Sequence, residues 1–137
     1  MRKVTIEMAY RSGITVNHYL GRSKGGGYFV TAPARQFMEE LGWRLKSSHI
    51  EEWNMPISVT TSGRFRDKKS TPDLSNLSKV ILDGIQDLTG VNDQNFRWRD
   101  GTISWEKTME PMLTITVAEN IERYVEKVID TEKEKMV

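Results

Sequence analysis

One segment in the middle of the chain, residues 71–93, most constrains the possible fold. It begins Thr71-Pro72-Asp73 and continues as Leu-Ser-Asn-Leu-Ser-Lys up to Lys79. At about 100° per residue, its apolar side chains form a single stripe that would face a core. That stripe comprises Leu74, Leu77, Ile81, Ile85 and Leu88. The pattern predicts a helix that begins near Asp73, with Thr71 as its N-cap and Pro72 as its first residue.

A second arc of the same helix is polar. It contains Asp73, Asn76, Asp83 and Asp87, with Lys79 at its edge. Neighbouring carboxylates repel one another and are stabilised by a divalent cation. The chain has no cysteine and two histidines, so oxygen ligands and magnesium are expected for any metal site. The arc fits a solvated helix face equally well, with an aspartate in the first turn that favours the helix dipole.

The composition predicts one domain and a reducing compartment. A chain of 137 residues can bury a core, and without cysteine it forms neither disulfides nor a thiolate zinc site. His18 and His49 lie in no zinc-binding spacing. No apolar run approaches the length of a membrane span, and the N-terminus does not resemble a signal peptide. We therefore expect a soluble cytoplasmic protein without a membrane partner.

The net charge of +1 hides an uneven distribution. Residues 1–72 hold 12 Lys/Arg and 6 Asp/Glu, a balance of +6, whereas residues 73–137 hold 8 and 13, a balance of −5. A basic surface beside an acidic centre is what a nuclease needs, because cations hold phosphates and carboxylates hold the metal. The same asymmetry also occurs by chance in other enzymes.

Hydrophobic periodicity predicts an α+β fold in a single domain, with a mixed sheet of about four strands packed by two or three helices. Strands are expected at 4–8, 56–61, 96–105 and 112–117. A helix is expected at 31–48, capped by Thr31, with Phe37, Leu41 and Leu45 on its apolar side and Trp43 either in the core or on the surface. Residues 10–30 are expected to be irregular, and an amphipathic helix is expected at 120–135, either docked or partly frayed.

Two basic segments are candidates for contact with nucleic acid. The first is the glycine-rich run from Gly21 to Tyr28, which contains Arg22 and Lys24; it lacks the order of a phosphate-binding P-loop and also fits a flexible hairpin tip. The second, expected to be a loop over residues 64–70, leads directly into the Asp73 helix. Its cations would clamp a phosphate backbone, or would only be solvated. They are Arg64, Arg66, Lys68 and Lys69.

The order of these features resembles the RusA family of Holliday junction resolvases, which are often encoded by phages and prophages. The resemblance covers roughly residues 3–119, from the first strand and an Asn17-containing stretch to Glu110-Pro111-Met112-Leu113-Thr114-Ile115. Its centre is Asp-x-x-Asn-x-x-Lys-x-x-x-Asp, here Asp73 to Asp83, followed by Gly90-Val91-Asn92-Asp93-Gln94. Residues 1–119 would be the RusA-like endonuclease domain and residues 120–137 a C-terminal helical extension outside the resemblance.

The resemblance implies a magnesium-dependent endonuclease of DNA recombination and repair, with manganese as the alternative ion. Such an enzyme binds branched DNA as a homodimer and nicks two strands symmetrically. The family's catalytic positions correspond to Asp73, Asn76, Lys79 and Asp93, and Asn17 joins the basic residues as a DNA contact. Two family acids are replaced, by Ser75 and Asn92.

These features lead to a working hypothesis of phosphodiester hydrolysis. Asp73 and Asp93 would hold the metal, with Asp83 as partial compensation for the missing acids, and Lys79 would stabilise charge on the phosphate. Ser75 and Asn76 would orient waters or carboxylates. Two other hypotheses are a branched-DNA-binding protein with little or no cleavage, and a small regulatory or structural phage protein whose polar arc is only solvated.

Overall fold

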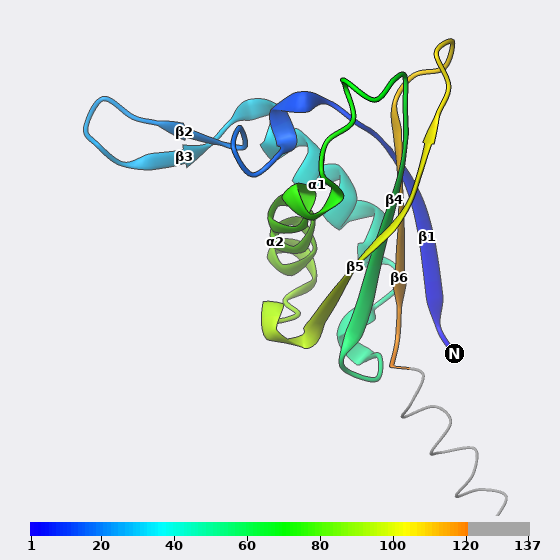
Figure 1. The fold of residues 1–137 in the computed structure, drawn as a ribbon. Helices are drawn as coiled ribbons and strands as arrows, with labels where there is room; N and C mark the ends of the chain where they lie inside the picture. The colour runs from blue at the N-terminus through cyan, green and yellow to red at the C-terminus, as the bar shows by residue number, and fades with distance from the viewer. Residues whose placement is uncertain (121–137) are drawn as a thin grey trace, which may run out of the picture.

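The computed structural model describes residues 1–120 and confirms the predicted α+β class, with a mixed four-stranded sheet and two α-helices in one domain. Both helices lie on the same face of the sheet, and a small two-stranded hairpin projects from the body (Figure 1). The strands are β1 (Lys3–Ala9), β2 (Leu20–Arg22), β3 (Tyr28–Val30), β4 (Ile57–Phe65), β5 (Phe96–Trp105) and β6 (Met112–Ala118). The helices are α1 (Ala32–Lys46) and α2 (Ser78–Thr89), with 3-10 turns η1 (Ser12–Ile14), η2 (Ile50–Glu52), η3 (Leu74–Leu77) and η4 (Asp93–Asn95).

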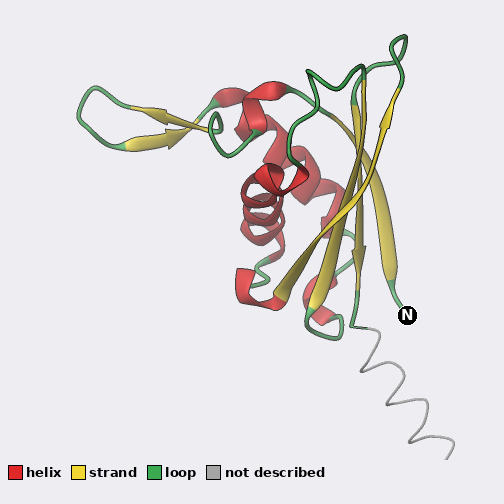
Figure 2. Cartoon of the chain, in the orientation of Figure 1, coloured by secondary structure: helices red, strands yellow, loops and turns green. Residues whose placement is uncertain are grey.

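The sheet has the order β1-β6-β4-β5, in which the last strand of the chain lies inside the sheet. β6 pairs antiparallel with both β1 and β4, whereas β4 and β5 are parallel. A parallel pair needs a crossover connection, and η3, α2 and η4 provide it. Figure 2 shows this connection on the helix-covered face.

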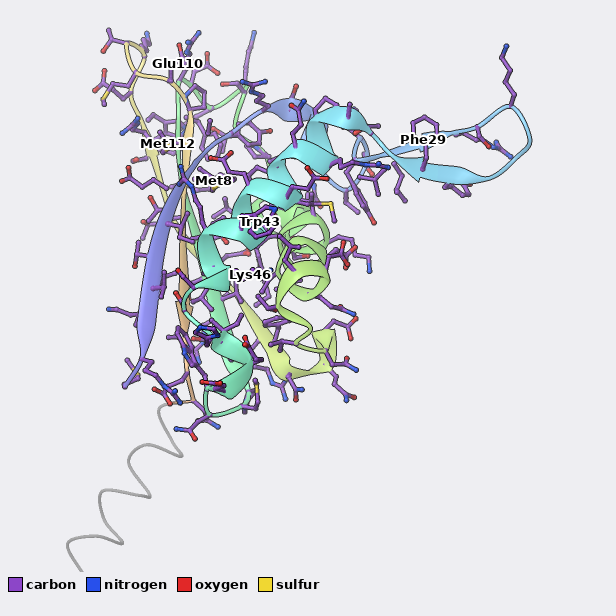
Figure 3. All side chains as sticks on the ribbon, turned by 180° about the vertical axis from the view of Figure 1, so that it is seen from behind. Met8, Phe29, Trp43, Lys46, Glu110 and Met112 are labelled. Carbon is purple, nitrogen blue, oxygen red and sulfur yellow. The ribbon has the colours of Figure 1, made fainter. Side chains whose placement is uncertain are left out.

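The predicted apolar stripes form the core. Phe37, Leu41 and Leu45 of α1 are buried, as are Ile81 and Ile85 of α2. Thr31 occupies the N-cap position of α1, as predicted, but its hydroxyl makes no capping hydrogen bond. Trp43 is settled as a surface residue: it is 60% exposed, and the Lys46 ammonium lies 4.4 Å from its ring centroid. Figure 3 shows both side chains on the outside of α1.

The prediction places the start of the loop at residues 64–70 too early in the sequence. β4 continues through Phe65, because the alternation of buried and half-buried side chains persists through Gly63 to Phe65. Arg64 is therefore a strand residue on the sheet face opposite the helices. Residues 10–30 also contain more regular structure than predicted, since β2 and β3 form an antiparallel hairpin there. The interpretation of the glycine-rich run as a hairpin tip is confirmed.

The central helix begins later than predicted. Asp73, and not Thr71, is the first capping residue; it caps the 3-10 turn η3, after which α2 starts at Ser78. The proline at position 72 disfavours helical backbone at Thr71. The Thr71 hydroxyl is instead used in a loop contact with the carbonyl oxygen of Asp67.

The predicted C-terminal helix falls almost entirely outside the described residues. For residues 1–120, no helix combines the length and apolar character that crossing a membrane requires.

Candidate functional site

Asp73 opens the candidate site on an exposed turn. Its Oδ1 accepts a hydrogen bond from the Ser75 hydroxyl at 3.0 Å and lies 3.4 Å from the Ser75 amide nitrogen. The Asn76 amide in turn donates to the Asp73 carbonyl at 2.9 Å, which closes the 3-10 turn. The turn presents the Asp73 carboxylate and the Ser75 hydroxyl side by side toward solvent. This arrangement suits a hard cation that keeps most of its waters.

Lys79 and Asp83 form an ion pair one helical turn apart, with Nζ 3.5 Å from Oδ1. The Asp83 side chain is more than two-thirds buried, whereas Lys79 is exposed. Each charge is therefore largely balanced by the other. Lys79 follows Asp73 by six residues, with the η3 turn between them.

The Asn17 stretch packs directly against the Asp73 turn. The backbone N–H of Val16 donates to the carbonyl oxygen of Asn76 at 2.8 Å. Asn17 follows in a tight turn, closed by a 2.8 Å hydrogen bond from the His18 amide to Thr15, and its side chain is exposed. Two segments of the predicted site, far apart in the sequence, thus meet through a backbone hydrogen bond.

Asp93 lies at the other end of α2. It begins η4, while the Asn92 side chain caps that turn by accepting from the Gln94 amide at 3.1 Å. The 12 residues of α2 extend about 18 Å between the two aspartate-bearing turns. Ligands of one magnesium ion lie within about 4 Å of each other. Within the single chain, the length of α2 therefore separates the two aspartate-bearing turns.

No described part of the chain has a dense cluster of ligands. Within residues 1–120, no set of three or more aspartate, glutamate or histidine side chains lies close enough to hold a metal. Magnesium often binds through only one or two carboxylates, with waters and substrate phosphates completing its shell. The Asp73 turn fits that sparser mode of binding.

The loop after β4 is ordered by Asp67. Its Oδ1 accepts from both the backbone N–H and the hydroxyl of Ser70, each at 2.9 Å. These hydrogen bonds, the backbone one foremost, lower the pKa of Asp67 below its ordinary value, with a smaller contribution from the charge of Lys107. The loop therefore has a defined turn structure that fixes where its cations lie.

The four predicted cations of this region differ in their availability. The Arg64 guanidinium donates to the Glu110 carbonyl at 3.0 Å, and Arg66 pairs with the Glu110 carboxylate at 2.7 Å. Figure 3 places Glu110 at the end of the sheet, near the turn that precedes β6. Lys68 lies over the ring of Trp105 with its Nζ 5.6 Å from the centroid. Lys69 is exposed; its backbone hydrogen-bonds to Asp67, and its ammonium forms no ion pair with any residue from 1 to 120.

The β2–β3 hairpin carries Arg22 and Lys24 away from the body of the molecule (Figure 1). Its tip is closed by Ser23, which accepts at its hydroxyl from the Gly27 amide at 3.1 Å and donates its own amide to the Gly27 carbonyl at 2.7 Å. Gly26 has φ of +89°, a conformation that favours glycine. Both cations are exposed, but no contact ties this arm to the Asp73 turn.

Sequence reasoning missed Trp105. The pattern of alternating residues identified it only as the end of a strand, yet its indole Nε1 donates to the Thr71 hydroxyl at 2.9 Å, two residues before Asp73. An aromatic residue at a strand end, followed by the charged run Glu106-Lys107, was the available signal. The tertiary contact itself depends on the parallel pairing of β4 and β5.

No family model and no curated protein matches this chain. Among solved structures, 2C-methyl-D-erythritol 2,4-cyclodiphosphate synthase from Plasmodium vivax aligns at a TM-score of 0.40 and 11% identity, over 85% of this chain and 93% of that one. IspF from Plasmodium falciparum in a CDP complex aligns at 0.28 and 12% identity, over 65% and 55%. At such TM-scores neither likeness defines a shared fold, so neither enters the functional argument.

Proposed function

We propose that this protein is a magnesium-dependent endonuclease that acts on branched DNA, with four-way junctions as the substrate and paired symmetric nicks as the product. One observation carries the proposal. The Asp73 turn, the Asn17 stretch and the basic loop at 66–71 converge at one end of the molecule, linked by the hydrogen bonds of Val16 to Asn76 and of Trp105 to Thr71. The resemblance of residues 3–119 to the RusA family supports the same assignment, and implies a cytoplasmic enzyme.

In this proposal the Asp73 carboxylate and the Ser75 hydroxyl hold the ion together with a substrate phosphate. When bound, magnesium would supply a Lewis acid for the phosphate and a more acidic water as the nucleophile. Lys79, the exposed member of the pair with Asp83, would leave Asp83 for the substrate and offset the charge that develops on the phosphate. Asn17 and the loop cations would hold the backbone on either side.

The separation of Asp73 from Asp93 gives the proposed dimer a specific role. A two-fold axis that places two α2 helices antiparallel would bring Asp73 of one protomer near the partner's Asp93. Each site would then contain residues of both protomers, and a dimer would hold two equivalent sites. A four-way junction has approximate two-fold symmetry, so this arrangement matches paired cuts.

A junction-cleavage assay with and without magnesium tests the proposal. We expect wild-type protein to cut a labelled four-way junction only with a divalent ion present. Asp73→Asn would abolish cutting, because the lost carboxylate is the one that would hold the ion. Junction binding would survive, because that carboxylate repels the DNA phosphates. Cutting by Asp73→Asn at the wild-type rate would reject the mechanism, and a protein without affinity for junctions would reject the whole assignment.

A second candidate function is binding of branched DNA with little or no cleavage. It is favoured by the replacement of two family acids by Ser75 and Asn92, both of which are engaged in local turn contacts. Ser75→Asp separates the two functions, since it returns a charge and a ligand next to Asp73. Increased magnesium-dependent cutting would indicate a weakened enzyme, and binding without product in both proteins would indicate a binding protein.

A further inference from the structure

Trp105 is an exposed aromatic residue on the same side of the sheet as the candidate site. It is the Cα partner of Phe65 in the parallel pairing of β4 and β5, so both side chains lie on the helix-covered face. Phe65 is fully buried, whereas Trp105 is 48% exposed, because the strand extends past the cover of the helices. Ile103, also on this strand, is 39% exposed.

The Trp105 ring is held in place although it faces solvent. Its Nε1 donates to the Thr71 hydroxyl, and that hydroxyl donates to the Asp67 carbonyl at 2.6 Å. Asp67 is in turn fixed by Ser70. The plane of the indole is therefore set by a chain of hydrogen bonds through Thr71, which lies two residues before Asp73.

The segments around the ring carry four cations, and three acids beside them: Asp67, Glu106 and Glu110. Lys68 lies over the ring face, and Arg66, Lys69 and Lys107 belong to the segments that flank it. Fixed aromatic rings among cations are the surface on which unpaired nucleobases stack, because every base has a π face and every phosphate seeks a cation. A ring held by a hydrogen bond, with a lysine over its face, favours a nucleic-acid partner.

Resting on the proposed function, we propose that Trp105 is the stacking platform for a base left unstacked at the branch point and thereby selects branched over duplex DNA. The Lys68 contact with the ring is exposed and weak. A phosphate would draw Lys68 away, and the base would take its place on the ring. Trp105 is a specificity-determining residue in this role, since it touches a base and not the scissile phosphate.

The test compares Trp105→Ala and Trp105→Phe with wild type. Trp43→Ala is the matched control, because Trp43 is also exposed and also lies under a lysine, but on α1. The probes are a four-way junction and a linear duplex of the same arm sequence. We expect Trp105→Ala to weaken junction binding by about 5- to 100-fold and duplex binding hardly at all. Trp105→Phe would keep most of the affinity, and Trp43→Ala would match wild type.

Equal loss on both probes, or no loss on either, would overturn the stacking role. If Trp105→Ala fails to fold, fluorescence decides: binding of the four-way junction to wild type would quench tryptophan emission, and the quench would vanish in Trp105→Phe. An unchanged quench would refute the proposal. If Trp105→Ala loses junction selectivity and wild type never cuts, the stacking role is upheld and the nuclease is rejected. If Trp105→Ala cuts normally with unaltered selectivity, the nuclease is upheld and the stacking role is rejected.

Discussion

Arg66 donates through Nη2 to Oε1 of Glu110 at 2.7 Å, which joins the loop after β4 to the turn before β6. Both side chains are at least half exposed, so the pair is weak as a source of stability. Its main effect is electrostatic, because it neutralises one of the cations that the DNA-binding proposal needs.

The first prediction removes that neutralisation. Glu110→Gln frees Arg66 for a phosphate and deletes one negative charge from the proposed DNA surface. We expect junction affinity to rise about two- to fivefold at low salt, measured by fluorescence anisotropy, and the gain to fade as salt rises. Glu40→Gln is the control, since it makes the same charge change in the Glu40–Arg44 pair on α1. An equal gain in junction affinity for the two variants would mean that the DNA does not bind at the Arg66 loop.

The second prediction concerns the number of phosphate contacts. Each contact releases counterions, so replacing Arg66 or Lys69 by alanine should flatten the slope of log affinity against log salt by about 0.9. Lys46→Ala on α1 should leave the slope unchanged. Arg64→Ala should act mainly on stability, because the Arg64 side chain is bound to the backbone of Glu110. Identical slopes for all of these variants would mean that the loop only faces solvent.

The third prediction tests whether the site is shared between protomers. Asp73→Asn and Asp93→Asn should each be inactive alone. In a mixed dimer, one site would carry both changes and the other would be intact. Mixing equal amounts should therefore restore about a quarter of all sites. The product would be single nicks and not paired cuts. Mixtures that stay inactive after confirmed subunit exchange would mean that each site lies within one protomer. Sedimentation should also give a species heavier than the 15.8 kDa chain.

The fourth prediction is a pH dependence that comes from Glu119. This carboxylate is buried, which alone would raise its pKa, but hydrogen bonds and charge from Arg2, with Asn54, lower the pKa from 4.5 to about 2. A carboxylate whose pKa is lowered by folding stabilises the folded state at any pH above its pKa in the unfolded chain. That contribution is lost as the pH falls from 4.5 toward 2. Glu119→Gln should cost about 1–3 kcal/mol near neutral pH in urea unfolding. The difference in free energy of unfolding between Glu119→Gln and wild type should disappear in acid. A difference that stays constant with pH would contradict the ion pair.

The fifth prediction concerns the contact between α1 and α2. A Cβ built on Gly42 would lie 2.7 Å from the Leu88 Cβ and 2.8 Å from its Cγ. Gly42→Ala should therefore lower stability by about 1–3 kcal/mol, less the gain in helix propensity. Leu88→Ala should relieve part of the clash in the double variant, because it removes the Leu88 Cγ and Cδ1 but keeps the Cβ, and thermal unfolding of all four proteins would measure this relief as a coupling energy. Simple additivity would mean that the Leu88 side chain beyond its Cβ does not limit the space at position 42.

Helices and strands were predictable from the sequence where one hydrophobic periodicity, helical or alternating, continued without interruption. The stripe of Phe37, Leu41 and Leu45 fixed α1, and alternation fixed β6 nearly to the residue, whereas a register shift interrupts the alternation of β5. The start of α2 was not predictable in this way. Its apolar spacing runs on through Leu74 and Leu77, which are buried as expected, while the backbone there forms a 3-10 turn because the Asp73 side chain and carbonyl bind the next amides.

The candidate site was predictable as a set of residues but not as a geometry. Residue types identified Asp73, Lys79 and Asp93 as chemically suitable. Their separation depends on the direction of α2, which is set by its crossover between two parallel strands and not by any local signal. Trp105 and the Asp67 turn were missed for the same reason, since their contact joins segments 34 residues apart through the sheet.

The position of β6 also determines the order in which the protein can assemble. This strand is made last among the described elements, yet it fills the gap between β1 and β4, pairing Ile6 with Ile115 and Thr61 with the same residue. During synthesis on the ribosome, β1 and β4 must therefore wait with open edges until residues 112–118 emerge. Contacts across such long loops slow folding and leave strands available to other chains. A nascent or truncated chain that stops before Met112 should thus need chaperone protection.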